Sequence, residues 1–120
     1  MFAFILGCLY LSTALLHLWL IKEKFNIFRF IYNPRNRNYL LIFDVPFLLL
    51  SFAAIIEESH WFLFVIFFMH AINSMTLLLK PQLFYQSKDE IQLMEVESLN
   101  NYLVIMTSVF GVGSLLISYL

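Results

Sequence analysis

Four apolar runs, each close to the length needed to cross a lipid bilayer, dominate the sequence. They occupy residues 2–21, 39–56, 61–79 and 102–120. A helix rises about 1.5 Å per residue, so about 20 apolar residues span the hydrocarbon core. Backbone crossing lipid must satisfy its own hydrogen bonds, and the runs lack the alternation of barrel strands. The sequence therefore predicts an all-α integral membrane protein, a four-transmembrane-helix bundle that forms a single domain over residues 1–120.

The composition indicates that lipid, rather than water, surrounds these runs. Apolar residues make up 62% of the 120 residues and charged residues 12%, and the mean hydropathy is +0.83. Soluble domains are about half apolar and about a quarter charged. A soluble chain this short could not cover so much apolar side chain with its own polar surface. The first run also lacks the preceding Lys or Arg of a secretory signal peptide.

The distribution of Lys and Arg predicts the orientation in the membrane. Five of the seven basic residues lie between the first and second runs, and Lys80 and Lys88 lie between the third and fourth. Cytoplasmic segments collect Lys and Arg. We therefore expect residues 22–38 and 80–101 in the cytoplasm, both termini outside a cell membrane, and a short outer hairpin at residues 57–60. The five basic residues of the first segment are Lys22, Lys24, Arg29, Arg35 and Arg37.

The first cytoplasmic segment interleaves these cations with aromatic residues. We interpret it as a lipid-facing basic loop that places rings at headgroup level and fixes the orientation of the chain. Specific lipid or nucleic-acid binding is the alternative, and the lipid bilayer, not nucleic acid, is the partner we expect. Asn33 and Pro34 form a turn signal that is expected to end any helix continuing from the first run.

The second cytoplasmic segment is predicted to contain an amphipathic helix before the last span. Pro81 is expected to end the third span. Ser87 and Glu90 then have the spacing of a helix capping box, and apolar residues follow at helical intervals. We interpret this part as a solvated connector, and docking to a partner protein is the alternative.

Polar residues within the spans form a predicted intramembrane cluster. Counted from the cytoplasmic ends, His17 and Asp44 lie at a depth of about 7 Å, and His70 lies deeper. Such residues cost free energy in lipid unless they have a partner or reach water. We interpret Asp44 as a structural hydrogen-bonding residue; the alternative is a protonatable or cation-binding carboxylate paired with His17 or His70. The predicted cluster comprises His17, Asp44, His70, Asn73 and Thr107.

Neither a cofactor, a metal site nor a catalytic motif is predicted. The different depths of His17 and His70 disfavour a haem held by both, and their spacing with Asp44 is not specific for a metal. No nucleophile elbow accompanies the serines. Cys8, the single cysteine, cannot form an internal disulfide. We therefore expect a protein that is not an enzyme.

Small and polar residues recur at helical spacing and mark the faces expected to pack together. The predicted helix-packing positions are Gly7, Ala14, Gly111 and Ser114. The face in the first span comprises Ala3, Gly7, Tyr10, Ala14 and His17, and that in the fourth comprises Thr107, Gly111, Ser114 and Ser118. The third span carries a polar stripe of His70, Asn73 and Ser74 that ends at Leu77.

Two hypotheses for the function follow. The first is a non-enzymatic accessory, regulatory or immunity-type protein that acts through helix–helix contacts. Its partner would be a second copy or a larger membrane complex, and its motivation is the small-residue face around Gly111. The second is a proton- or cation-coupled small transporter or channel, expected as a homodimer. Its motivation is the Asp44–His17–His70 layer.

Overall fold

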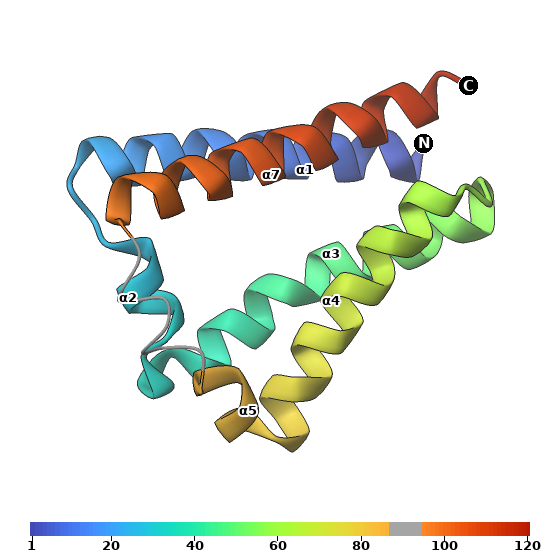
Figure 1. Cartoon of the computed structure of the whole chain (residues 1–120). Helices are drawn as coiled ribbons and strands as arrows, with labels where there is room; N and C mark the ends of the chain where they lie inside the picture. The colour runs from blue at the N-terminus through green and yellow to red at the C-terminus, as the bar shows by residue number, and fades with distance from the viewer. Residues whose placement is uncertain (87–94) are drawn as a thin grey trace.

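The computed structural model describes residues 1–86 and 95–120, and within these ranges every regular element is a helix (Figure 1). Four of the helices are long and apolar enough to cross a membrane. The prediction of an all-α four-helix bundle is thus confirmed, and the chain is a multi-pass membrane protein. The long helices are α1 (Phe2–Lys22), α3 (Arg37–Glu57), α4 (Trp61–Leu79) and α7 (Val96–Ser118). The short ones are α2 (Ile27–Ile31), a 3₁₀ turn (Pro34–Asn36) and α5 (Pro81–Tyr85).

The helix bounds match the predicted spans closely except at α7. This helix begins at Val96, six residues before the predicted span, because Glu97, Asn100 and Asn101 continue the same helix outside the apolar run. Hydropathy indicates where the chain enters lipid, and it located the apolar part of α7. It does not locate the start of the helix, which lies in the polar residues before that part. The predicted capping box at Ser87 and Glu90 lies outside the described residues, as does most of the predicted amphipathic segment.

The connection between α1 and α3 differs from the prediction in one respect. We expected the Asn33–Pro34 pair to end a continuation of the first helix, but α1 already ends at Lys22, and Lys24 turns the chain with a φ of 59°. Asn33 instead begins the 3₁₀ turn, and its side chain accepts a hydrogen bond of 3.0 Å from the Arg35 N–H. Pro81, as predicted, lies just beyond the end of α4.

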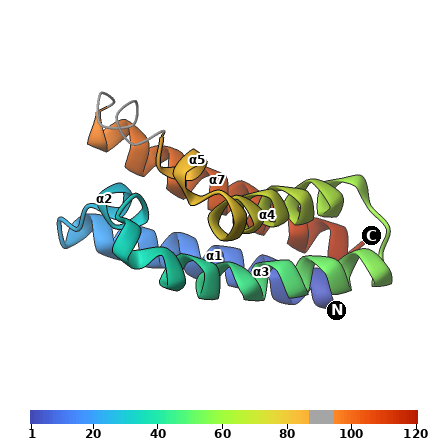
Figure 2. The same ribbon diagram turned by 90° about the horizontal axis from the view of Figure 1, so that it is seen from below.

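The long helices form two antiparallel pairs, α1 with α7 and α3 with α4 (Figure 1). Contacts between α1 and α3 join the pairs, so that these two helices lie side by side when the molecule is seen from below (Figure 2). The pairs approach each other at the terminal end, which carries Met1, Leu120 and the α3–α4 connection. They diverge toward the opposite, basic end, which carries the end of α1 at Lys22 together with α2 and α5.

Two glycines bring the backbones of α1 and α7 into close approach. A β-carbon on Gly7 would stand 2.9 Å from the Gly111 carbonyl oxygen, and one on Gly111 would stand 2.8 Å from Leu11. Small residues permit such crossings in membranes, where packing rather than water drives helix association. Ala14 and Ser114 are also buried. All four helix-packing positions of the sequence thus lie in the interior of the chain itself.

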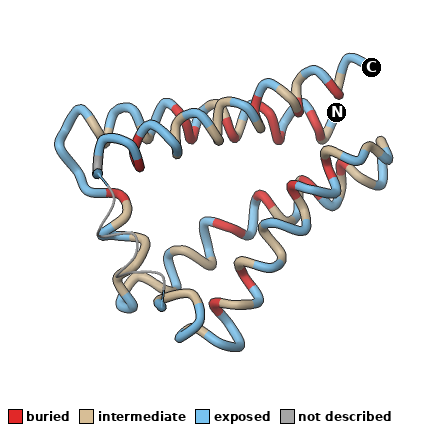
Figure 3. Tube along the Cα trace, viewed as in Figure 1, coloured by how far each residue is buried: buried red, intermediate tan, exposed pale blue. Residues whose placement is uncertain are grey.

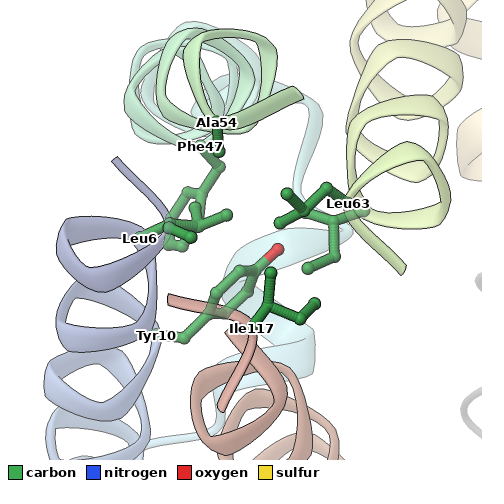
Figure 4. Packing of buried hydrophobic residues seen from close by; sticks show 8 residues of the cluster. Leu6, Tyr10, Phe47, Ala54, Leu63 and Ile117 are labelled. Atoms are coloured by element: carbon green, nitrogen blue, oxygen red, sulfur yellow. The ribbon is translucent and has the colours of Figure 1, made fainter. Parts of the chain in front are cut away.

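The apolar core occupies the terminal half, where the two pairs meet (Figure 3). Side chains from all four long helices converge there; Figure 4 shows Leu6, Tyr10, Phe47, Ala54, Leu63 and Ile117. Many other large apolar side chains point outward, as lipid allows: Phe52 and Phe68 are each more than half exposed. The core residues of α3 and α4 nearest to the basic end are Phe47 and Ile66. Asp44 and His70 follow them by about one helical turn toward that end, so these two polar residues border the core.

Polar contacts join the helices at each end of the bundle. At the terminal end, the Met1 ammonium group forms an ion pair with the Glu57 carboxylate. At the basic end, the Arg37 guanidinium donates a 3.1 Å hydrogen bond to the Leu78 carbonyl, one of the last carbonyls of α4 that lack a partner within the helix. These contacts hold the two ends of α3 to its neighbours.

Candidate functional site

Asp44 and His70 form a hydrogen-bonded pair between α3 and α4. Asp44 Oδ1 contacts His70 Nδ1, and the two side chains are only 7% and 14% exposed. Asp44 lies seven residues into α3, about 10 Å from its start, and His70 lies at a comparable distance from the end of α4. The pair therefore lies inside the membrane-spanning part, where an isolated carboxylate would be costly.

Two further side chains complete a network that joins three helices. Ser74, one turn after His70 on α4, donates its hydroxyl proton to Asp44 Oδ2. Tyr10 of α1 brings its hydroxyl group to His70 Nε2. Both Asp44 oxygens and both His70 ring nitrogens thereby have a partner. In Figure 4 the Tyr10 hydroxyl points away from α1 into the space between the helices.

The bonding pattern is consistent with one set of proton positions. With Asp44 as a carboxylate that accepts from both partners and His70 as a neutral imidazole, the His70 proton is on Nδ1 and Nε2 is an acceptor. Tyr10 must then donate its hydroxyl proton to Nε2. The result is a directed chain, Tyr10 to His70 to Asp44, with every polar group satisfied.

Aromatic side chains enclose this chain of hydrogen bonds. The Phe47 ring stacks on the His70 imidazole, with centroids 5.0 Å apart and planes inclined by 14°. Phe47 and Phe110 flank the Tyr10 ring at centroid distances of 4.7 and 5.6 Å. Rings in these positions keep water from the polar groups and lower the local dielectric. Electrostatic interactions are stronger in such surroundings than in water.

The structure brings together two of the five residues of the predicted cluster. Asp44 and His70 are partners, whereas His17 is half-buried near the basic end with no described residue bonded to its Nδ1. The Thr107 hydroxyl donates to the Leu103 and Val104 carbonyls of its own helix. Asn73 is half-buried within α4, and its side chain makes no hydrogen bond with any described residue. The common depth of these side chains therefore did not make them one cluster.

Tyr10 and Ser74 are the network members that the prediction of the cluster omitted. The sequence did contain a signal for both. Tyr10 lies on the same predicted helix face as His17, and Ser74 lies on the same predicted polar stripe as His70. Ser74 follows His70 by four residues, so one carboxylate on a neighbouring helix can reach both. Asn73 follows His70 by three residues, and its side chain does not bond to the Asp44 carboxylate as that of Ser74 does.

The arrangement suits proton transfer better than nucleophilic chemistry. Ser74 bonds to the carboxylate and not to the imidazole, and Tyr10 occupies the His70 nitrogen that would activate a serine in a hydrolase triad. Among residues 1–86 and 95–120, no group of three or more His, Cys, Asp or Glu side chains is placed to hold a metal ion. The polar layer of His17, Asp44 and His70 that motivated the transport hypothesis is not assembled as a whole, because His17 does not bond to the other two. What remains is a carboxylate–imidazole pair, hydrogen-bonded between two membrane helices.

Comparison with known proteins finds no matching family model, no matching curated protein and no matching solved structure. The function is therefore argued from the geometry of the network.

Proposed function

We propose that this chain is a small proton-coupled transporter or channel, in which the Asp44–His70 pair takes up and releases the transported or coupling proton. The observation that carries the proposal is the continuous hydrogen-bonded chain from Tyr10 through His70 to Asp44, buried between three membrane helices. Ionisable residues inside spans mark proton relays in pumps and transporters. A structural network would also have all of its buried polar groups satisfied. What favours proton transfer is that the central member is an imidazole with a hydrogen-bonded partner on each ring nitrogen.

Proton flux into proteoliposomes tests the proposal. A pH-sensitive dye inside the vesicles would report acidification when an outside-acid pH gradient and a counter-ion path are supplied. We expect the wild-type protein to acidify the lumen faster than empty vesicles do, and both Asp44→Asn and His70→Gln to abolish the difference. Ser51→Ala is the matched control, because Ser51 is buried on the same helix but bonds only to the Leu48 carbonyl.

The outcome is informative either way provided that the variants fold. Circular dichroism and size-exclusion elution in detergent verify the fold before reconstitution. Wild-type flux equal to that of empty vesicles refutes the proposal, and so does unchanged flux in Asp44→Asn.

The assembly hypothesis rested on the small-residue face around Gly111 and on the lack of a catalytic motif in the sequence, and the first of these supports is weakened. The small-residue face around Gly111 packs against α1 of the same chain, so that Gly111 and Ser114 are both buried without any partner protein. This face is therefore already packed against α1 in the folded chain. We base the proposed function on the polar network instead.

We also propose that the basic end faces the cytoplasm of a cell membrane. This orientation is supported by the placement of Lys22, Lys80 and the cations of the α1–α3 connection at one end of the bundle. Met1, Glu57 and the C-terminus lie at the other end, where the described residues include no Lys or Arg.

A further inference from the structure

A shallow, open surface cavity of about 380 Å³ lies in the connection between α1 and α3, at the basic end. Two of the five cations of this connection, Lys24 and Arg29, line it, whereas Lys22, Arg35 and Arg37 do not. No acidic side chain lines it, and neither of the two cations forms an ion pair with a described residue. Its charge therefore favours an anion.

Four of the five polar side chains of the cavity wall offer hydrogen-bond donors; the fifth, Asn36, already donates its NH₂ group to a backbone carbonyl at 3.1 Å. The side-chain oxygens of Asn26 and Asn33 already accept from the backbone N–H groups of Arg29 and Arg35, each at 3.0 Å. Their amide NH₂ groups remain as donors beside the ammonium and guanidinium groups. A ligand for such a wall needs several acceptor oxygens and negative charge, which a phosphate group supplies.

The position of the cavity matches the depth of lipid headgroups. It lies between the end of one membrane-spanning helix and the start of the next, and two phenyl rings, Phe25 and Phe30, line it. These rings are 42% and 37% exposed, with centroids 6.0 Å apart. Exposed rings beside cations are typical of segments that lie at the membrane surface.

We propose that this cavity binds a phosphate group, as presented by an anionic phospholipid headgroup, through Lys24 and Arg29. The left-handed backbone of Lys24 caps the C-terminal end of α1, with the Phe25 N–H bonded to the Leu20 carbonyl at 2.9 Å. As a result, Lys24 stands at the start of the connection, where it lines the cavity. The connection thereby becomes a specific headgroup site rather than only a determinant of orientation.

Lipid retention in native mass spectrometry tests the site. The detergent-solubilised protein is titrated with phosphatidylglycerol, and with phosphatidylcholine of the same acyl chains as the reference. We expect one tightly retained phosphatidylglycerol and a clear preference over phosphatidylcholine. The double variant Lys24→Gln/Arg29→Gln should weaken phosphatidylglycerol binding by about fivefold for each cation removed.

A matched double variant separates the site from general electrostatics. Lys22→Gln/Arg35→Gln removes the same charge from the same connection, but neither side chain lines the cavity. At an ionic strength that screens charges outside the site, this variant should leave binding within about twofold of wild type. Equal weakening by both double variants, or no wild-type preference for phosphatidylglycerol, overturns the proposal. Competition by millimolar inorganic phosphate would show that the phosphate group suffices, and its absence would show that the glycerolipid part contributes; both outcomes support the site.

Discussion

Gly7 of α1 and Gly111 of α7 face each other so closely that neither has room for a methyl group. A β-carbon on Gly7 would stand 2.9 Å from the Gly111 carbonyl oxygen and 2.7 Å from Leu115 Cγ. The backbone of one helix thus forms the packing surface of the other. Because backbone cannot turn aside as a side chain can, this crossing fixes the distance between the first and last spans.

Substitution of these glycines should destabilise the protein in a defined order. In Gly7→Ala the new β-carbon contacts the backbone of α7, and this clash should lower the free energy of unfolding by about 1–3 kcal/mol. The higher helix propensity of alanine offsets about 1 kcal/mol of that loss. Gly111→Ala should cost somewhat less, because its closest contact is the Leu11 side chain. Gly113→Ala meets only the outer edge of the Phe62 ring and should be close to neutral. Unfolding in mixed micelles with increasing SDS measures the order; a Gly113 effect as large as that of Gly7 would contradict it.

Removal of the Tyr10 hydroxyl should affect both stability and flux. Tyr10→Phe preserves the ring contacts with Phe47 and Phe110 but leaves His70 Nε2 buried without a donor. We expect a loss of about 1 kcal/mol in mixed-micelle unfolding. If the proposed proton function holds, dye-reported flux should fall as well. An unchanged stability would show that the hydroxyl group is not bonded as described.

Two buried serines should respond differently to the same substitution. Ser74→Ala removes a donor from the Asp44 carboxylate and should cost about 1–2 kcal/mol, since bonds to charged groups are the stronger ones. Ser51→Ala removes only a bond to the Leu48 carbonyl within its own helix and should cost less than about 0.5 kcal/mol. The same unfolding assay compares them, and equal losses would argue against a special role for the network.

Cysteine labelling can establish the proposed orientation. In a Cys8→Ser background, Ser59→Cys places a thiol in the α3–α4 connection, and Gln86→Cys places one just after α5, both at exposed positions. A membrane-impermeant maleimide added to intact cells should label the first variant and not the second. Labelling after lysis verifies that both thiols are reactive, and the reverse pattern would place the basic end outside.

The spans were predictable from the sequence because each is an uninterrupted apolar run of membrane length. Trp61–Leu79 follows a short polar connection and is ended by Pro81, so both of its bounds have a local cause. The start of α7 was not predictable from hydropathy, since Glu97 and Asn100 are as compatible with a helix in water as with a loop. The place where α1 ends depends on the unusual backbone of Lys24, for which the sequence offers no signal.

The site was predictable only in part, because hydrogen-bond partners depend on how helices are rotated against one another. Asp44 was identified as a buried carboxylate from its cost in lipid, but its partner was left open between His17 and His70. That choice is decided by the α3–α4 packing, which also brings Ser74 to the same carboxylate. His17 lies on the α1 face that includes Tyr10, but two turns nearer the basic end, beyond reach of the pair.

The pairing of α1 with α7 has a consequence for biosynthesis. The largest interface of the bundle joins the first span to the last, so it can form only when nearly the whole chain has been synthesised. The α3–α4 hairpin, by contrast, has both partners within one short stretch and can associate at once. The first span must therefore remain in the bilayer with its glycine face covered by lipid or by another protein. A chain truncated before α7 should accordingly be a substrate for membrane quality control, even though three of its spans are intact.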